Sequence, residues 1–164
     1  MEQVFVLGLD PGLSRCGYCV LDASVRSARA VALGVFRTRA GDAVPERLAE
    51  LLTDFRSLLG EFTPSVMAVE RVLFQTNVRT AMGVGQASGV LMAEAAGRGI
   101  SVVEYSPNEV KSAVAGDGSA SKEQVAAMVQ RLLDLAAPPR PADAADAAAV
   151  ALTHVAFATT TGAA

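Results

Sequence analysis

Apolar residues occur in short continuous runs along the first forty positions, and the first run ends at a clear turn signal. Residues 4–9 (VFVLGL) are followed by Asp10 and then by Pro11-Gly12, a pair typical of turns. Two further runs with the composition of strands, residues 17–22 (GYCVLD) and 28–39 (ARAVALGVFRTR), have only five residues between them. Three neighbouring strands with short links predict an antiparallel meander.

From Val44 the spacing of apolar residues changes to that of a helix. This spacing continues to Leu59, with Asp42 placed to cap the start of the helix and Gly60 placed to end it. The later pattern predicts a buried strand over 65–70, a helix over 78–97, a strand over 100–105, a short helix over 107–114, a helix capped by Ser121 and running to about 135, and an alanine-rich helix over 142–158.

This order of elements predicts a mixed α/β fold. Three strands come first, and helices alternate with strands afterwards, so we expect the later strands to be parallel and joined by right-handed crossovers. A chain of 164 residues has the usual size of one domain. We expect that domain to cover residues 1–158 and residues 159–164 (TTTGAA) to form a flexible tail.

The composition is that of a globular protein, with 51% hydrophobic and 19% charged residues, and it excludes a disordered chain. The sequence has no run of 18 or more apolar residues, so no membrane span is expected. The first residues, MEQVFVLGLD, lack the basic region and cleavage site of a signal peptide. A cytoplasmic location is therefore expected.

The two cysteines, Cys16 and Cys19, form a C-x-x-C within the second predicted strand. Residues at i and i+3 of a strand face opposite sides of the sheet, which opposes both a disulfide and a shared zinc ion. A structural zinc would also need two more ligands, and the chain has no second C-x-x-C and a single histidine, His154. Two small buried residues are the favoured interpretation.

Net charge is −3, which taken alone argues against nucleic-acid binding. The distribution of charge changes this picture, since residues 15–47 hold six arginines against three acids. Two bound divalent cations would also move the net charge from −3 to +1. Charge therefore leaves a nucleic-acid ligand open.

Four carboxylates occupy unusual positions. Asp10 ends the first predicted strand, Glu70 ends the fourth, and Asp143 and Asp146 lie three residues apart on one face of the last helix. Each has a plain structural explanation taken singly: Asp10 as a turn former, Glu70 as a solvated strand end, and the two aspartates as partners of the helix dipole. If the first and fourth strands are neighbours, however, all four meet at one edge of the sheet.

Four anions in one cleft would repel one another, and divalent cations would relieve that repulsion. Carboxylate oxygens are ligands suited to Mg²⁺ or Mn²⁺. Two such ions, about 3.5–4 Å apart, can activate a water and stabilise the leaving oxygen of a phosphodiester. His154 lies eight residues beyond Asp146, roughly 12 Å along a helix, so we expect a packed or surface histidine rather than a ligand of the same ion.

Five segments in register, spread from Leu7 to His154, resemble the RuvC family of crossover junction endodeoxyribonucleases: GLDPGLSRCGY, AVERVLFQTN, GQASGV, GSASKEQV and ADAADAAAVALTH. The resemblance implies a ribonuclease H-like fold, a five-stranded mixed sheet flanked by helices. It implies a homodimer that binds four-way (Holliday) DNA junctions and resolves them by paired symmetric nicks with Mg²⁺, in recombination and DNA repair. The branch-migration complex RuvAB is the partner that it implies.

The resemblance also assigns roles to residues. It implies that Asp10, Glu70, Asp143 and Asp146 are metal ligands. Two Mg²⁺ ions, with Mn²⁺ as a substitute, are expected, and Asp10, as the most central ligand, is expected to bridge them. Lys111 and Lys122, the only two lysines, match residues that contact DNA near the cut, and Lys122 is also expected to take part in catalysis. Arg79 is expected to contact DNA.

In one place the sequence departs from the family pattern. After the glutamate the family often has Val-Phe, with the aromatic ring stacking on a junction base, whereas this chain has Val72-Leu73-Phe74. Leu73 therefore holds the expected position. Phe74, one residue further, is the candidate for stacking, since base stacking on aromatic rings tolerates sequence change.

Small residues in the predicted 78–97 helix, Gly85 and Gly89 among them, permit close helix approach, and the resemblance places much of the dimer interface there. A dinucleotide-binding loop at GQASG is rejected, because the motif lies inside a predicted helix and follows no strand. Three alternatives stay open: an ATP-binding protein of the actin and sugar-kinase type, a non-catalytic junction-binding module, and a ribonuclease H-like nuclease acting on RNA.

Overall fold

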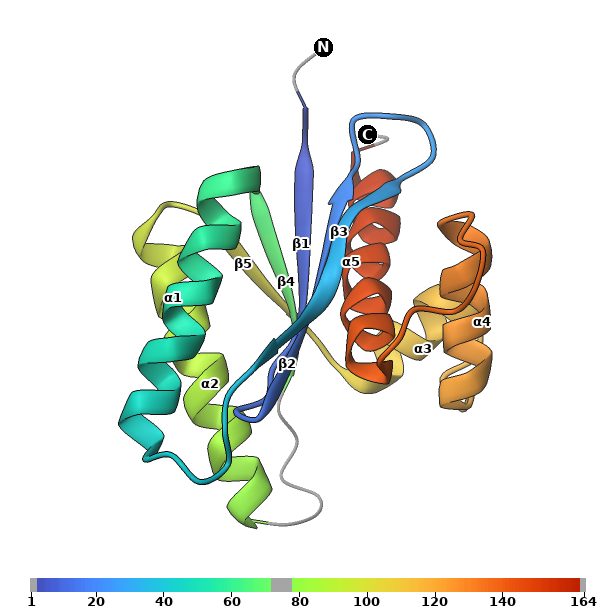
Figure 1. The fold of residues 1–164 in the computed structure, drawn as a ribbon. Helices are drawn as coiled ribbons and strands as arrows, with labels where there is room; N and C mark the ends of the chain where they lie inside the picture. Colours follow the sequence, from blue (N-terminus) through green and yellow to red (C-terminus); the bar gives the residue numbers. More distant parts are fainter. Residues whose placement is uncertain (1–2, 72–77, 163–164) are drawn as a thin grey trace.

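The computed structural model describes residues 3–71 and 78–162. In these residues the strands form one five-stranded sheet in the order β3-β2-β1-β4-β5 (Figure 1). The first three strands, β1 (Phe5–Asp10), β2 (Arg15–Asp22) and β3 (Arg29–Arg37), pair antiparallel, and β4 (Val66–Glu70) and β5 (Ser101–Tyr105) extend the sheet in parallel from β1. The predicted meander and the predicted parallel strands are both confirmed.

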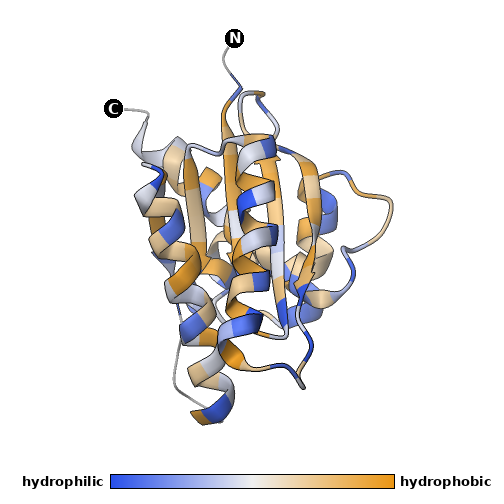
Figure 2. Cartoon of the chain, turned by 60° about the vertical axis from the view of Figure 1, so that its left-hand side comes forward, coloured by the Kyte–Doolittle hydropathy of each residue, from blue (hydrophilic) through white to orange (hydrophobic). Residues whose placement is uncertain are grey.

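Helices cover both faces of the sheet (Figure 1). One face carries α1 (Val44–Phe62) and α2 (Val78–Gly97); the other carries α3 (Pro107–Ala115), α4 (Lys122–Leu132) and α5 (Ala142–Thr161). Side chains alternate along β1, so that Leu7 and Leu9 pack toward α1 and α2 while Val6 packs toward α5. Figure 2 shows the sheet as the most apolar layer, with hydrophilic positions on the outer sides of the helices.

Helix α5 lies unusually close to the sheet, because both sides of the contact carry small residues. A Cβ at Gly8 would overlap the carbonyl oxygen of Ala147, and a Cβ at Gly17 would overlap that of Asp143. Alanines of α5, such as Ala144 and Ala151, are fully buried in this contact. The alanine-rich composition of the last helix is thus explained by its direct packing on β1 and β2.

The two cysteines face opposite sides of the sheet, as predicted. Cys16 belongs to the core under α1 and α2, and Cys19 belongs to the core under α5. Both are free and buried, and burial raises the pKa of each thiol to about 12. They are packing residues.

Helix α1 begins at Val44 as predicted, but the predicted capping residue and the predicted end are wrong. The residue that caps the start is Ala43, without a side-chain hydrogen bond, because the Asp42 carboxylate instead accepts a hydrogen bond from Arg39 Nε at 3.2 Å. At the other end the helix continues through Gly60 to Phe62, and it stops where Thr63 takes a left-handed conformation with φ of 43°.

The later helix boundaries differ by a few residues. Ser121 caps α4 as predicted, accepting a hydrogen bond from the Gln124 N–H at 3.1 Å, but α4 ends at Leu132 rather than near 135. Helix α5 continues to Thr161, beyond its predicted end at residue 158, and threonine hydroxyls such as that of Thr159 donate to helix carbonyls there. In residues 3–71 and 78–162, no helix combines the length and apolar character needed to cross a membrane.

Candidate active site

Two carboxylates arrive at one edge of the sheet because their strands are parallel neighbours. β1 pairs with β4 in a register that places Leu9 opposite Val69, so Asp10 and Glu70 follow side by side at the carboxyl ends of the two strands. The start of α5, with Asp143 and Asp146 in its first turns, lies at the same lower end of the molecule in Figure 1. The condition on which the predicted gathering of the four acids depends, that the first and fourth strands are neighbours, is confirmed.

A glycine on the neighbouring strand brings α5 to this position. Gly17 is the partner of Asp10 in the antiparallel pairing of β1 and β2. Because Gly17 has no side chain, the backbone of Asp143 can rest directly on it. The register of β1 with β2 and the close approach of the helix together fix Asp143 beside Asp10.

The surroundings of the two acids at the strand ends favour their protonated forms. Burial raises the pKa of Asp10 to about 8, with further contributions from the negative charges of Asp146, Glu70 and Asp143, in that order. Burial also raises the pKa of Glu70, and the charge of Asp146 adds to the effect. A carboxyl group at the end of a buried strand thus holds its proton near neutral pH unless a cation arrives.

Two basic side chains form ion pairs with the two aspartates of α5. Arg15 Nε lies 3.5 Å from Asp143 Oδ2, and Lys122 Nζ lies 3.1 Å from Asp146 Oδ2. Lys122 is the first residue of α4, directly after the Ser121 cap, so the capping box fixes where its side chain begins. The charge of Asp146 and its hydrogen bond raise the pKa of Lys122.

The donor set suits a hard divalent cation. All four groups are carboxylates, and a nearby cation would offset both the burial and the repulsion by the other acids that raise the pKa of Asp10. In the described residues no three His, Cys, Asp or Glu side chains are placed to hold one ion together. The ion pairs with Arg15 and Lys122 account for the orientation of Asp143 and Asp146, so a metal would compete with these two side chains.

Two clefts open at this end of the molecule, and the acids are divided between them. Glu70 and Asp146 line the first, together with Lys111 and Lys122. Asp10 and Asp143 line the second, whose other charged lining residues are Arg15, Arg47 and Arg79. Both predicted lysines and Arg79 therefore stand beside the carboxylates, while Leu73 and Phe74 lie outside the described residues.

Two arginines at the second cleft were not predicted as site residues. Arg15 makes the ion pair with Asp143, and its position five residues after Asp10 gave no pattern to identify it. Arg47 is only 9% exposed, although arginine is rarely buried. Its signal in the sequence was the spacing: it falls between Val44 and Leu51 on the apolar face of α1.

His154 is a packed histidine, as predicted. Its Nδ1 lies 2.8 Å from the Tyr105 hydroxyl, and burial lowers its pKa. It lies further along α5 and lines a different pocket from the four acids. The GQASG motif lies inside α2, which confirms that it is no dinucleotide loop.

The family profile of the crossover junction endodeoxyribonuclease RuvC matches residues 6–154. The crossover junction endodeoxyribonuclease RuvC of Pseudarthrobacter chlorophenolicus is 52% identical over 150 residues, covering 91% of this chain and 78% of the relative. The structure of Thermus thermophilus RuvC in complex with a Holliday junction substrate superposes with a TM-score of 0.90 at 36% identity, covering 96% of each chain. At 18% identity, the yeast mitochondrial Holliday junction resolvase Ydc2 shares the fold, with a TM-score of 0.70, covering 96% of this chain and 82% of that one. The sheet is the expected ribonuclease H-like one, and the chain belongs to the RuvC family of crossover junction endodeoxyribonucleases.

Proposed function

We propose that this protein is an endonuclease that resolves four-way DNA junctions by paired symmetric nicks. The observation that carries the proposal is the gathering of Asp10, Glu70, Asp143 and Asp146 at one edge of the sheet, with Lys122 in hydrogen-bond contact with one of them. The Thermus relative in complex with a Holliday junction supports the choice of substrate. Recombination and DNA repair are the processes that would supply such junctions.

Divalent cations, Mg²⁺ with Mn²⁺ as a substitute, fit the four carboxylates as ligands. Bound there, two such ions would supply an activated water and charge stabilisation for the leaving 3′-oxygen. The protein itself keeps the carboxylates close despite their repulsion. The parallel pairing of β1 with β4 positions Asp10 and Glu70, and the packing of α5 on Gly17 positions Asp143. Asp10, the acid whose pKa responds to all three others, is the central ligand.

The lysines provide positive charge at the same edge. Lys122 Nζ lies 3.1 Å from Asp146, and Lys111 lines the cleft that both residues share with Glu70. An ammonium group held there can pair with a phosphate whose charge grows in the transition state. We assign Lys122 to the cleaved phosphate and Lys111 and Arg79 to neighbouring parts of the DNA backbone.

A second copy of the chain would complete the enzyme, because a symmetric junction offers two equivalent cutting points. Helix α2 has an open face suited to this contact: Val78 is 77% exposed and Met82 is 60% exposed. Further along the same helix, a Cβ at Gly85 or Gly89 would meet open space. We propose that the homodimer forms through this face. RuvAB remains the partner expected from the resemblance.

Cleavage of a mobile four-way junction tests the proposal. The wild-type protein and Asp10→Asn are compared in Mg²⁺ on a junction and on a linear duplex of the same sequence. Paired nicks on the junction alone, absent in Asp10→Asn with an unchanged circular dichroism spectrum, are expected. Tight junction binding without cleavage in any divalent ion would instead mean a non-catalytic binding module.

A further inference from the structure

Arg47 is a buried arginine that lines the second cleft, as does one of its two hydrogen-bond partners, Ser14. Its Nε donates to Thr38 Oγ1 at 3.0 Å, and its Nη2 donates to Ser14 Oγ at 2.7 Å. Both acceptors are neutral hydroxyls. Among residues 3–71 and 78–162, no carboxylate oxygen lies within 4.0 Å of its guanidinium nitrogens. By contrast, Arg15 at the same cleft forms an ion pair with Asp143.

The guanidinium keeps unused donors. It has five N–H groups, and two of them serve Thr38 and Ser14, which leaves three. Every fully buried side-chain nitrogen or oxygen of the described residues has a hydrogen-bond partner, so the nitrogen without one, Nη1, reaches the accessible surface. Arg47 lines the second cleft, so these donors lie within reach of a ligand bound there.

Burying a charge without a counter-ion is unfavourable, so proteins usually pair a buried arginine. The two hydroxyls satisfy some donors but do not neutralise the charge. An anion in the cleft would neutralise it. The planar guanidinium suits a phosphate, which it can bind through two parallel N–H groups.

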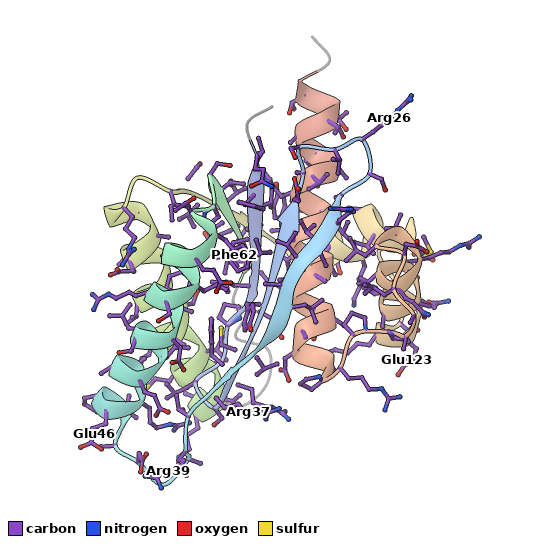
Figure 3. All side chains as sticks on the ribbon, turned by 45° about the horizontal axis from the view of Figure 1, so that its top comes forward. Arg26, Arg37, Arg39, Glu46, Phe62 and Glu123 are labelled. Carbon is purple, nitrogen blue, oxygen red and sulfur yellow. The ribbon has the colours of Figure 1, made fainter. Side chains whose placement is uncertain are left out.

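The surroundings of Arg47 favour the same ligand. The Thr38 hydroxyl is fully engaged, because it accepts from Arg47 and donates to the Leu13 carbonyl at 2.6 Å. The Ser14 hydroxyl accepts from Arg47, and within the described part of the chain its own proton has no acceptor, so it can serve as a further donor into the cleft. In Figure 3, Arg37 and Arg39 mark the connection from β3 to α1 that carries Thr38, at the opposite end of the molecule from Arg26.

We propose that Arg47, assisted by Ser14, forms a binding subsite for a DNA backbone phosphate next to the one that is cleaved. The subsite rests on the proposed nuclease function, since the cleft that contains it also contains Asp10 and Asp143. Asp10 and Asp143 together mark the catalytic edge, so a phosphate on Arg47 would position the strand across the carboxylates. Arg47 is thereby a positioning residue.

A purely structural role is the competing explanation, because the same hydrogen bonds tie α1 to the Ser14 turn and to Thr38. The test therefore needs a measurement that would not change if Arg47 only stabilised the fold. Neutral methylphosphonate linkages, placed one at a time along the strand around the cutting point, provide it. Binding of each junction is measured with Ca²⁺ in place of Mg²⁺, for wild type, Arg47→Gln, Ser14→Ala and Arg56→Gln.

The wild-type protein is expected to lose about tenfold or more in affinity at one methylphosphonate beside the cut, as for loss of a charged hydrogen bond. Arg47→Gln should bind the unmodified junction about that much more weakly and should be insensitive to that one substitution. Its slope of log affinity against log salt, which is negative, should become less steep by about 0.9. Ser14→Ala, which keeps the charge, should show a smaller loss at the same phosphate.

Arg56→Gln is the matched control. It removes the same charge from the same helix, but Arg56 pairs with Glu94 away from the cleft, so its methylphosphonate profile should equal that of wild type. If Arg47→Gln loses affinity at the same methylphosphonate positions and by the same factors as wild type, the proposal is overturned. This holds whether or not the variant has a lowered melting temperature. Failure of wild type to bind any junction would instead overturn the proposed function.

Discussion

Gly17 lies directly beneath the backbone of Asp143, so closely that a Cβ on the glycine would overlap the aspartate carbonyl oxygen. Gly17 is also the β-sheet partner of Asp10. One missing side chain therefore sets the separation between a carboxylate on a strand and a carboxylate on a helix. The candidate metal site depends on backbone packing as much as on its acids.

Gly17→Ala should displace the start of α5 and separate Asp143 from Asp10. The overpacking is expected to lower the free energy of unfolding by about 1–3 kcal/mol and to lower junction cleavage more than junction binding. Urea denaturation and single-turnover cleavage would measure the two effects. Gly60→Ala is the control, since that helical glycine faces open space and alanine there should be neutral or stabilising. Full cleavage by Gly17→Ala would contradict the role given to this contact.

Asp10→Asn should stabilise the metal-free protein at alkaline pH. The pKa of Asp10 is raised to about 8 in the folded protein, against about 3.9 in an unfolded chain. The contribution of its proton to stability is therefore complete below about pH 4 and is lost as pH rises through 8. In a chelator at pH 8.5, the variant should melt a few degrees above wild type, and the difference should shrink toward pH 5. A difference independent of pH would contradict the raised pKa.

Arg15→Gln should tighten the binding of divalent cations. Arg15 Nε lies 3.5 Å from Asp143 and is more than half exposed, so the ion pair that a metal must displace is a modest one. We expect a gain of about two- to fivefold in Mn²⁺ affinity, measured by isothermal titration calorimetry. Arg39→Gln, which removes an arginine paired with Asp42, should leave the affinity unchanged. Weaker Mn²⁺ binding by Arg15→Gln would show that Arg15 supports the site instead.

His154 should make the protein sensitive to mild acid. Burial lowers its pKa below the ordinary value near 6.5, so the unfolded chain takes up the proton first as pH falls. The stability that the neutral ring provides is full above about pH 6.5 and is lost as pH falls toward the folded pKa. His154→Gln should therefore show a flatter dependence of unfolding free energy on pH between 7 and 5.5. Equal slopes for the two proteins would count against a pKa lowered by burial of the ring.

Much of the fold could be predicted because its signals are local. Continuous apolar runs marked the strands, the change of spacing at Val44 marked α1, and Ser121 with Gln124 marked the start of α4. The start of α1 at Val44 could be predicted, but its capping residue and its end could not. Asp42 is drawn back to Arg39, and the helix passes Gly60, because tertiary contacts and the conformation of Thr63 outweigh residue preference there.

The acids of the site could be predicted because strand ends and helix faces follow from sequence spacing. The basic residues around them could not, apart from the two lysines and Arg79. Arg15 and Arg47 reach the second cleft from β2 and α1, and which faces of these elements approach each other depends on packing. In the sequence, Arg47 is a charged residue on an apolar helix face without a recognisable partner. The structure supplies its partners, the hydroxyls of Ser14 and Thr38.

The four carboxylates come from β1, β4 and α5, so the first and the last belong to segments separated by most of the chain. During synthesis, Asp10 and Glu70 leave the ribosome long before Asp143 and Asp146. If the four acids are the metal ligands, as proposed, a nascent chain would hold half of the set, and nuclease chemistry would begin only after α5 has docked on Gly8 and Gly17. The late arrival of α5 would thus act as a safeguard against DNA cutting by incompletely made protein.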